Sequence, residues 1–513
     1  MMKTLFVSGS SVCMELQNEK PFYAEKEYEI AVNGVFCKKA KENVFSLFGL
    51  QPDTQYEIKA AGETVVVRTA QETACLNVHK NGAVGDGETE DTVALQACID
   101  VCPCGGRVFV PAGTYLTGPL KLKSNMTLEL AKDATLLGVT EVDKYAPIPA
   151  VIVNEKGEER VLTSWEGDAI SSRLSLLYGF DVENINIVGE GVVDGNAQNS
   201  TWWTEEYKQR VIGRPRLIYL NGCRNITFHG IAVQNSPSWT LHPFFCENLN
   251  FYDLNVFSPA DKAPNTDGLD PEGCDNVNII GCRFSTGDDC IAIKANKIDL
   301  ARKYQRSASR HTIRNCYMRH GHGAVVLGSE IAGGVKDLAV SQCIFEKTDR
   351  GLRIKTRRGR GKLCVIDGVS FENIKMDGVG IPFVINMYYN CDPDGHSEYV
   401  WSREKRPVGD DTPYIGSVEF KNIDCKNVQG AAGYFDGLVE QPVRRVRLEN
   451  VTATYDPNAV PMAPDGMDKV GGVCRWGLYF DNVKEIELKN VSIQGQDGDR
   501  VILKNYEKFN ETP

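Results

Sequence analysis

The sequence predicts an all-β protein: a right-handed parallel β-helix with a small β-sandwich domain at its N-terminus. The first observation is a four-residue repeat, one turn residue followed by apolar, polar and apolar residues, which recurs from residue 105 onward. Copies that begin at Asn225, Asn248 and Asn276 are 23 and 28 residues apart, with no helical period between them. The second observation is that residues 1 to about 70 alternate apolar and polar residues in short runs separated by turn residues. This pattern is typical of a β-sandwich.

We assign residues 1–72 to the β-sandwich. Runs such as Tyr28 to Val32 and Thr64 to Arg68 would be its strands, with Asn33-Gly34 and Pro52-Asp53 as turns. Residues 50–58 resemble the corner of a fibronectin type III domain, where a tyrosine hydroxyl, here that of Tyr56, ties its strand to upstream backbone. The domain shows no site of its own, so we expect it to be a spacer or a wall of a substrate cleft.

Residues 73–513 would form the β-helix, which should be the catalytic domain. Near its start, Thr89 to Asp91 precede a short amphipathic helix, and Thr89 or Asp91 can cap it. A helix here would cover the open first coil, whose core and strand edges would otherwise meet water.

The repeats distinguish a β-helix from other repeat folds. Repeats of only strands and turns let each coil stack on the preceding one, whereas a β-propeller would need a four-stranded blade every ~40–50 residues. Alternate side chains of each strand would enter a narrow core, which explains the Val, Ile and Cys at every second position. The copies begin at Asn125, Asn184, Asn225, Asn248, Asn276, His311, Asp337, Gly368, Ser417, Arg445 and Glu485.

Composition excludes several classes of partner. The chain has 513 residues, 42% hydrophobic and 24% charged, with a net charge of −11. These values indicate a soluble globular protein and argue against a nucleic acid or an anionic membrane as partner. No run of 18 apolar residues is present, so we expect no transmembrane helix. Oligomeric state is left open.

Charge is unevenly spread. Residues 294–362 contain 17 Lys and Arg against 5 Asp and Glu, a local excess of 12 positive charges. Either this is a solvated basic edge, or it attracts an acidic ligand.

The chain has 17 cysteines, an odd number. A secreted domain more often pairs its cysteines, so we expect a reducing compartment, the cytoplasm. The first ten residues hold too short an apolar run for a signal-peptide core. A leader removed from the chain would instead make the protein secreted.

Three carboxylates should meet on one face of the β-helix. Asp267 and Asp288 are 21 positions apart, close to one coil, and Asp289 follows directly. Neighbouring coils lie about 4.8 Å apart, and both Asp288 and Asp289 can face solvent if Gly287 permits a bent backbone. Clustered carboxylates repel, which raises the pKa of at least one. A protonated acid beside ionised ones suits acid–base glycoside hydrolysis.

At this point the sequence resembles a known family. Asn265-Thr266-Asp267, Gly287-Asp288-Asp289, Gly321-His322-Gly323 and Arg353-Ile354-Lys355, in this order, are similar to the four signature motifs of glycoside hydrolase family 28, the polygalacturonases. The resemblance covers roughly residues 75–495. It implies a right-handed parallel β-helix and inverting hydrolysis of α-1,4-galacturonosyl bonds in an acidic oligo- or polysaccharide. We expect no metal and no other cofactor.

The resemblance also implies roles. Asp288 would be the general acid, Asp267 and Asp289 would hold and activate the water, and His322 would orient or tune the acid. Substrate-binding residues would be Asn265, Arg353, Lys355 and Tyr388, with Tyr389 as competitor for the tyrosine role. Arg353 and Lys355 are two apart and so share one face of a strand, where they suit the carboxylate of the leaving-side sugar.

Residues 381–415 form a long insertion that can block one end of a cleft. Exo-acting family members close the cleft in this way, and some bacterial members carry a similar N-terminal domain, so we expect exo-cleavage. Three alternatives stay open: a rhamnogalacturonan or other mixed-pectin hydrolase, a calcium-dependent pectate lyase-type enzyme, and a non-catalytic carbohydrate-binding β-helix.

Overall fold

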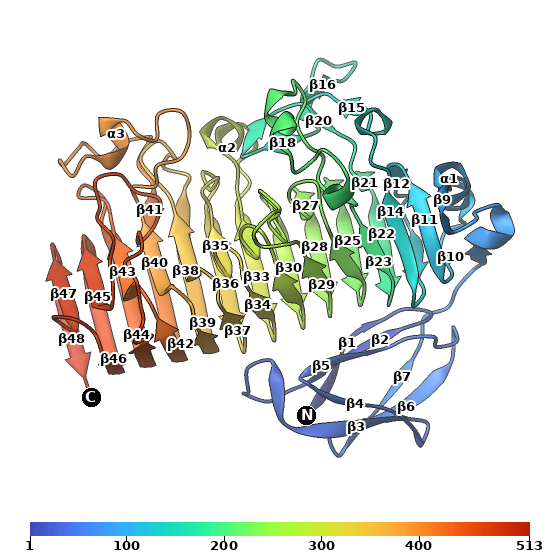
Figure 1. Cartoon of the computed structure of the whole chain (residues 1–513), viewed down its shortest axis with the longest axis horizontal. Helices are drawn as coiled ribbons and strands as arrows, with labels where there is room; N and C mark the ends of the chain where they lie inside the picture. Colours follow the sequence, from blue (N-terminus) through green and yellow to red (C-terminus); the bar gives the residue numbers. More distant parts are fainter.

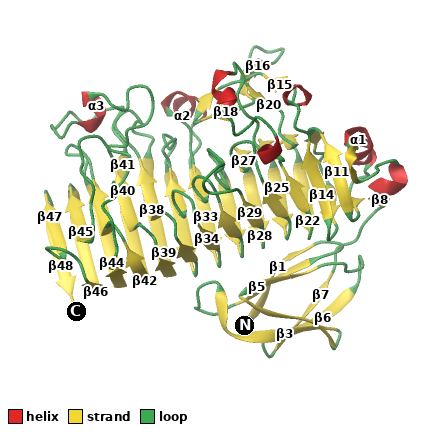
Figure 2. Ribbon diagram, in the orientation of Figure 1, coloured by secondary structure: helices red, strands yellow, loops and turns green.

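The computed structural model describes the backbone of residues 1–513 and every side chain except those of Lys208 and Gln209. A long stack of parallel coils runs across Figure 1, and the N-terminal domain lies against one side of it. Helices and many long loops lie along the opposite edge of the coils (Figure 2). Within the described residues, no helix combines the length and apolar character needed to cross a membrane.

The N-terminal domain consists of two antiparallel sheets around their own core. One sheet has the order β1 (Met2–Val7), β2 (Val12–Leu16), β5 (Val44–Leu47). The other has the order β4 (Val35–Glu42), β3 (Tyr23–Val32), β6 (Gln55–Ala60), β7 (Glu63–Arg68). Val12, Ile30 and Ile58 are fully buried in the core. The Tyr56 hydroxyl accepts a hydrogen bond of 2.9 Å from the backbone N–H of Gln51, the tie that the resemblance implies for this corner.

The domain is fastened to the side of the β-helix by buried polar contacts. Both carboxylate oxygens of Glu15 accept hydrogen bonds from the Arg314 guanidinium, at 2.7 and 2.8 Å. The Ser46 hydroxyl donates to Asp253 at 2.6 Å, and Phe48 stacks on His229. These partners lie in or beside the strands of the large sheet, away from the predicted acids. The domain therefore braces the coils, and the expectation that it walls a cleft is wrong.

The large sheet has two parallel rows of strands. One row comprises β10 (Gly106–Val110), β13 (Met126–Leu130), β22 (Glu183–Gly189), β25 (Arg224–His229), β28 (Glu247–Tyr252), β30 (Asp275–Ile280), β33 (Ala308–Arg314), β36 (Val335–Ser341), β39 (Val365–Asp377), β42 (Ser417–Val428), β44 (Val443–Tyr455) and β46 (Val483–Gln494). The other comprises β11 (Gly113–Thr117), β14 (Ala134–Gly138), β23 (Val192–Asp194), β26 (Ala232–Gln234), β29 (Asn255–Phe257), β31 (Arg283–Ser285), β34 (Tyr317–Arg319) and β37 (Ile344–Glu346). Four short strands complete the sheet: β8 (Cys75–Asn77), β41 (Tyr414–Ile415) and β48 (Lys508–Thr512) pair with the first row, and β9 (Asp86–Glu90) pairs with the second.

A second parallel face, here called the second sheet, positions the predicted site. It contains β12 (Leu120–Lys121), β21 (Leu177–Phe180), β24 (Ile218–Asn221), β27 (Leu241–Phe244), β32 (Ile291–Ile293), β35 (Val325–Leu327), β38 (Arg350–Lys355), β40 (Ile381–Asn386), β43 (Ala431–Asp436), β45 (Trp476–Asp481) and β47 (Val501–Lys504). Single bridges from Leu241 to Leu269 and from Leu269 to Ile291 join its two halves. Predicted and observed folds agree: the chain is a parallel β-helix with small N-terminal sheets.

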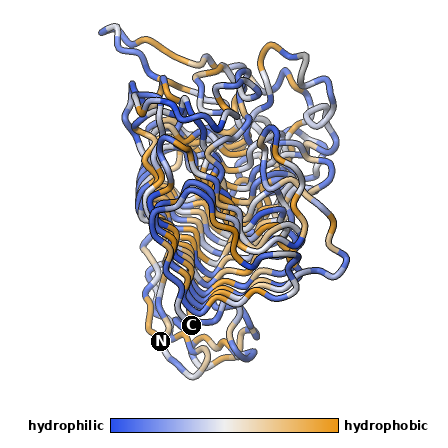
Figure 3. The backbone as a smooth tube through the Cα atoms, turned by 90° about the vertical axis from the view of Figure 1, so that its left-hand side faces the viewer, coloured by the Kyte–Doolittle hydropathy of each residue, from blue (hydrophilic) through white to orange (hydrophobic). Residues whose placement is uncertain are grey.

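The repeated asparagines form hydrogen-bonded ladders, here called the asparagine ladders. The side-chain amide of Asn184 donates to Asn125 at 2.7 Å, that of Asn225 to Asn184 at 2.9 Å, and that of Asn248 to Asn225 at 3.0 Å. All four residues have φ near +60°, which asparagine tolerates better than most residues. The view along the coils in Figure 3 shows the hydrophobic segments of successive coils stacked in register.

The capping helix is present and begins directly after the predicted Thr89 to Asp91 stretch. Helix α1 spans Thr92–Val101 and buries Leu95 and Ile99 against the first coil. Thr89 lies in β9 (Asp86–Glu90) and is not the cap. Asp91 occupies the N-cap position, but its carboxylate accepts the backbone N–H groups of Val84 and Gly85 at 2.7 and 2.9 Å, so it fixes the preceding loop instead.

Two insertions rise beside the second sheet. Between β14 and β21 lie three small hairpins: β15 (Pro147–Ile148) with β20 (Ser172–Arg173), β16 (Val151–Val153) with β17 (Glu159–Val161), and β18 (Ser164–Trp165) with β19 (Asp168–Ala169). After β40, the chain forms a long loop that contains α3 (Glu398–Trp401). Helix α2 (Ile298–Tyr304) follows β32 and lies between them (Figure 1).

Candidate active site

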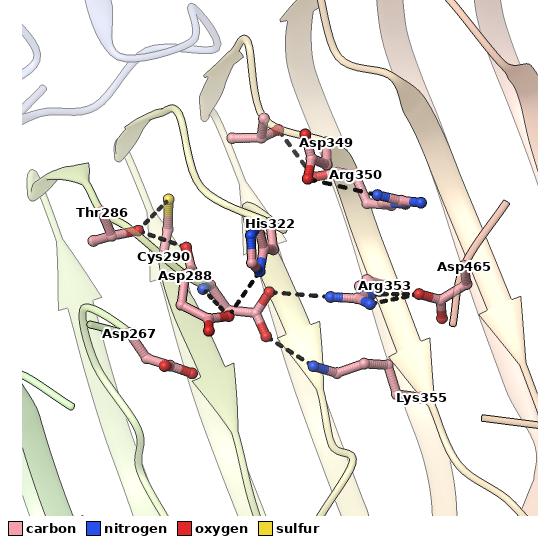
Figure 4. A network of polar contacts seen from close by, with 12 residues as sticks. Asp267, Thr286, Asp288, Cys290, His322, Asp349, Arg350, Arg353, Lys355 and Asp465 are labelled. Carbon is pink, nitrogen blue, oxygen red and sulfur yellow. Dashed lines mark hydrogen bonds and ion pairs between the residues drawn. The ribbon is translucent and has the colours of Figure 1, made fainter. Parts of the chain in front are cut away.

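The structure brings the three predicted acids together. Asp267 lies just before the Leu269 bridge, and Asp288 and Asp289 lie in the connection from β31 to β32. One oxygen from each carboxylate lies within 4.8 Å of the others. The coils touch directly, because the backbone N–H of Gly268 donates to the carbonyl of Asp289 at 3.0 Å. Figure 4 shows Asp267 and Asp288 side by side, with His322, Arg353 and Lys355 on the following coils.

A tight turn lets consecutive acids share one face. A β-carbon on Gly287 would lie 2.2 Å from the carbonyl oxygen of Ala263, so only glycine fits here. The Thr286 hydroxyl donates to the Asp288 carbonyl at 2.8 Å, and the Asp289 N–H donates to the Asp288 carboxylate at 2.9 Å. The bend is therefore held by local hydrogen bonds, and the need for glycine comes from close packing.

His322 binds the acid to which the resemblance gives the proton. Its Nδ1 lies 3.1 Å from Asp288 Oδ1, and its ring is about half exposed. The bond to Asp288 raises the pKa of His322 above its ordinary value. Burial acts to raise the pKa of Asp288, but the bond and charge of His322, followed by the charges of Lys355 and Lys294, outweigh it and lower that pKa to about 2. In the free site, the pair therefore keeps its proton on the imidazole.

Asp267 has the opposite environment. Burial, and then the charges of Asp288 and Asp270, raise its pKa well above the usual range. Crowding thus raises the pKa of one acid, as expected, but that acid is Asp267. The surroundings of the free site thus favour a proton on Asp267 more than on Asp288, whereas the roles implied by the resemblance need Asp288 protonated and Asp267 ionised.

Asp289 is neutralised by the predicted substrate-binding cations. Lys355 Nζ lies 2.8 Å from Asp289 Oδ2, and Arg353 Nη1 lies 3.4 Å from Asp289 Oδ1. Both cations project from β38, two residues apart, as expected for one face of a strand. Arg353 also binds Asp465, with Nε and Nη2 at 2.8 and 2.5 Å from one carboxylate oxygen (Figure 4).

The structure places Tyr389, the competitor, and not Tyr388 beside the cations. Tyr388 is buried, its ring faces the Arg403 guanidinium at 3.6 Å, and its hydroxyl accepts from the backbone N–H of Val439. Tyr389 lies beside the cations instead, with Lys355 Nζ at 5.4 Å and the Arg353 guanidinium at 5.6 Å from its ring centroid. The chain leaves the strand at Asn386, so strand alternation no longer decides which tyrosine faces the site.

Asn265 lies beside the acids with its amide already engaged. Its backbone is in the left-handed region, with φ of 54°, and its side-chain oxygen accepts from Arg214 Nη2 at 2.6 Å. Arg214 also donates to the carbonyl of Pro264 at 2.7 Å. Asn265 therefore connects the turn before Asp267 to a buried arginine.

Most of the basic excess in residues 294–362 has acidic partners from elsewhere in the chain. Arg357, Arg358 and Arg360 pair with Asp394, Glu440 and Asp392, and all three guanidinium groups are buried. Exposed members pair as well, for example Arg310 with Asp275 and Lys362 with Asp410. The solvated-edge interpretation therefore holds for some of these cations, and the cation pair at Arg353 and Lys355 is what faces the acids.

Three acids this close can also hold a cation. Here Arg353 and Lys355 already supply positive charge to Asp289, which weakens the case for a metal at this position. Absence of a cofactor stays a prediction.

Sequence reasoning missed several residues of the site. Asp465 reaches Arg353 from 112 positions later in the chain, on a loop without the four-residue repeat. Lys294, Asp270 and Glu330 form a buried cluster beside Asp267. Asp270 and Lys294 lie within five residues of the motif acids. A charged side chain in a segment that is expected to be buried could have indicated that both belong to the site.

Comparisons with known proteins agree with this geometry. The profile of "Glycosyl hydrolases family 28" matches residues 104–459, and that of "Rhamnogalacturonase A/epimerase, pectate lyase-like" matches residues 75–129. A probable polygalacturonase of Vitis vinifera is 29% identical over 383 residues, 72% of each chain. An exo-poly-alpha-D-galacturonosidase of Dickeya chrysanthemi is 30% identical over 406 residues, 71% of this chain and 63% of that protein.

Solved structures share the fold. A family 28 exopolygalacturonase of Yersinia enterocolitica superposes with a TM-score of 0.71 at 22% identity, covering 99% of this chain and 98% of that one. An exopolygalacturonase of Thermotoga maritima gives a TM-score of 0.67 at 25% identity, covering 82% and 92%. Since the family profile covers more than half of the chain, the protein belongs to glycosyl hydrolase family 28.

Proposed function

We propose that the protein hydrolyses α-1,4-galacturonosyl bonds of oligogalacturonides and polygalacturonate, one unit at a time from a chain end. One observation carries the proposal: three carboxylates within 4.8 Å lie directly beside a buried arginine and a buried lysine. Acids alone would suit many sugars, but two cations at the same opening select a sugar that carries a carboxylate.

Asp288 is the acid best placed to meet the glycosidic oxygen. Its side chain is 21% exposed, compared with 5% for Asp267 and 1% for Asp289. In the free site its proton rests on His322, 3.1 Å away. A sugar that excludes water from the pair disfavours the two separated charges, so the proton moves to Asp288, ready for the leaving oxygen. Asp267 and Asp289 then hold and activate the water.

The leaving-side sugar would bind at β38. Lys355 and Arg353 face the acids from this strand, and Tyr389 adds an aromatic surface next to both. A sugar carboxylate that approaches Lys355 competes with Asp289 for its ammonium. Substrate binding would thereby free Asp289 to act on water.

Cover on both sides of the acids supports exo-cleavage. On the N-terminal side, His242 and Glu272 on the outer face of the second sheet are buried, and the Ser164 hydroxyl of the β18–β19 hairpin donates to Glu272 at 2.8 Å. Trp165 of the same hairpin stacks on Trp239, with ring centroids 4.9 Å apart.

On the C-terminal side, the same face is covered by two loops. Asn386 and Asp436 are buried; Asn386 donates to Asp465, and Asp436 accepts from Arg403. A groove for internal cleavage of a long chain would leave this face open over several coils. Here the half-exposed His322 and the partly exposed Asp288 lie between two covered regions, which suits a chain end or a short oligosaccharide.

Inversion follows from the family resemblance. The carboxylate oxygens lie closer together than the ~6.5–9.5 Å common among inverting glycosidases, so the spacing does not itself support inversion. If the family expectation holds, proton NMR of the first product released from trigalacturonate should show the β-anomer before mutarotation; an α-anomer would indicate retention.

Product analysis tests the activity itself. Incubation with trigalacturonate should release galacturonate as the first monomeric product, and Asp288→Asn should abolish it. A product with the ultraviolet absorbance of an unsaturated uronate would show a lyase. Activity on rhamnogalacturonan but not on polygalacturonate would show the mixed-pectin alternative, and no activity on either would leave a binding module.

We also propose that the enzyme works in the cytoplasm. All 17 cysteines are free thiols, and several stack on neighbouring coils, as where the backbone N–H of Cys223 contacts Cys246 Sγ at 3.3 Å. Such rows would be exposed to cross-linking during folding in an oxidising compartment. Cell fractionation tests this proposal, and recovery of the protein from the medium would contradict it.

A further inference from the structure

Lys294 is a buried lysine beside the acids. The proposed mechanism gives this lysine no role. It follows β32 directly, and its side chain is 5% exposed. Its Nζ lies 3.1 Å from Glu330 Oε2, 3.6 Å from Asp270 Oδ1 and 3.9 Å from Asp267 Oδ2. A buried ammonium needs acidic partners, but here the shortest contact goes to Glu330 and not to a motif acid.

The ammonium cannot move far from this position. The Trp239 ring faces it, with the ring centroid 4.4 Å from Nζ. The backbone N–H of Lys294 donates to the carbonyl of Pro271 at 3.1 Å, within the stacked coils. Glu330 is fixed as well, because its other oxygen accepts from the Ser329 hydroxyl at 3.0 Å. Lys294 is thus a stationary positive charge one coil from Asp267.

Asp267 is surrounded by charges from every element packed against it. Two acids, Asp288 and Asp289, come from the β31–β32 connection, and Asp270 comes from the same segment as Asp267. Two cations complete the set: Arg214, from the segment before β24, and Lys294, which follows β32. Behind them lie His322 on Asp288, Lys355 on Asp289 and Glu330 on Lys294.

We propose that Lys294 is a positioning residue for the reaction. Its ammonium holds the Asp267 carboxylate in place and ionised, as a base that acts on water must be. Glu330 sets how much of the ammonium charge Asp267 receives, because both acids compete for one cation. This inference rests on the proposed hydrolysis.

The direction of the electrostatics agrees with this geometry. Burial and the neighbouring acids raise the pKa of Asp267, and Lys294 opposes them. Asp270, whose carboxylate oxygens accept no hydrogen bond from the described residues, has a pKa raised to about 8 by burial. Lys294 therefore lowers the pKa of both Asp267 and Asp270, and its removal would leave Asp267 protonated over a wider pH range.

Two substitutions with opposite effects test the proposal. The pH profile of kcat/KM on trigalacturonate should be measured for Lys294→Met and for Glu330→Gln. Lys294→Met removes the cation, so one limb of the profile should move to higher pH by about 1 to 3 units. Glu330→Gln frees the cation for Asp267, so the same limb should move to lower pH. Shifts in the same direction, or no shift, would overturn the proposal.

Further variants separate positioning from folding and from substrate contact. Lys294→Arg keeps the charge and should restore most of kcat with a wild-type profile. Lys297→Met removes a neighbouring lysine that pairs with Asp168 and Asp392, and it should leave the profile unchanged. A rise in KM for Lys294→Met without any change in the pH profile would show that Lys294 binds substrate instead.

A second measurement stays valid if the hydrolytic activity itself is refuted. An acid with a raised pKa in the folded state loses stability as pH rises from its unfolded towards its folded pKa. For Lys294→Met, the fall of Tm should therefore extend to higher pH than in the wild type. In an Asp267→Asn background this difference should shrink, because only the contribution of Asp270 then remains. An undiminished difference there would overturn the proposal whatever the enzyme cleaves.

Discussion

Lys355 Nζ lies 2.8 Å from Asp289 Oδ2, so a cation expected to bind substrate is bound to an acid expected to act on water. Each group is compensated before substrate arrives, although both are almost completely buried. A uronate carboxylate at β38 changes this balance. Binding of the sugar carboxylate by Lys355 and release of Asp289 from Lys355 therefore occur together in this site.

Lys355→Ala tests this binding. Loss of a charged hydrogen bond to the sugar carboxylate costs about 1.5–3 kcal/mol, so KM for oligogalacturonides should rise about 10- to 100-fold. Lys362→Ala is the matched control, since Lys362 is an exposed lysine that pairs with Asp410. Initial rates against substrate concentration measure both. An unchanged KM for Lys355→Ala would remove Lys355 from the substrate site.

Asp267→Asn should separate activity from stability. Because burial and neighbouring acids raise the pKa of Asp267, the ionised group weakens folding at pH 7, and an amide relieves that repulsion. Tm at pH 7 should therefore rise, while kcat falls about 10²- to 10⁴-fold. Differential scanning calorimetry and product assays check the two halves. A lower Tm would show that the acid cluster is stabilising.

His322 should set a pH limb of the reaction. Its bond to Asp288 raises its pKa above the usual ~6.5, so the proton needed by Asp288 is lost, and activity falls, as pH rises through that raised value. The same bond stabilises the fold below pH ~6.5 and ceases to do so as pH rises through the raised value.

His322→Gln should remove both effects. The variant should have low activity, and its pH profile should lack the alkaline limb. The difference in Tm between the variant and the wild type should become smaller at high pH. A wild-type alkaline limb in the variant would assign that limb to another group.

Shortening the β18–β19 hairpin should change the mode of attack. Replacing residues 163–170 with a short Gly-Ser linker removes Trp165 and the contact from Ser164 to Glu272. Internal cleavage should then appear as a faster fall in polygalacturonate viscosity per reducing end formed. The control replaces residues 154–158 at the exposed tip of the β16–β17 hairpin, and its product pattern should match the wild type.

Glu15→Gln should weaken the brace without affecting catalysis. Breaking one partner of a buried ion pair costs about 3–5 kcal/mol, and Glu15 binds Arg314 through both oxygens. Tm should fall, whereas kcat/KM at 25 °C should not change, because these contacts lie on the large sheet. Glu27→Gln, at an exposed pair with Lys39, is the control. A fall in kcat/KM would show that the domain influences the site.

Sequence reasoning succeeded where one coil specifies the next. Asp267 and Asp288 could be placed together because they are nearly one coil apart, and Arg353 and Lys355 because a strand alternates its side chains. The fold followed from the repeated turn residues for the same reason. Each of these inferences needs only local geometry that the sequence repeats.

It failed where loops decide the outcome. Tyr388 and Tyr389 could not be separated, since the strand ends at Asn386 and alternation stops. Asp465 has no periodic relationship to Arg353, which it nevertheless binds. The basic excess looked like a ligand attractor because most of its acidic partners come from distant parts of the chain.

The asparagine ladders have a consequence for biosynthesis. In each ladder the amide of the later coil donates to the carbonyl oxygen of the earlier one, from Asn184 to Asn125 and again from Asn422 to Asn373. If the coils form as the chain leaves the ribosome, each new coil finds its asparagine acceptors already in place on the coil before it, and folding can proceed by adding one coil at a time.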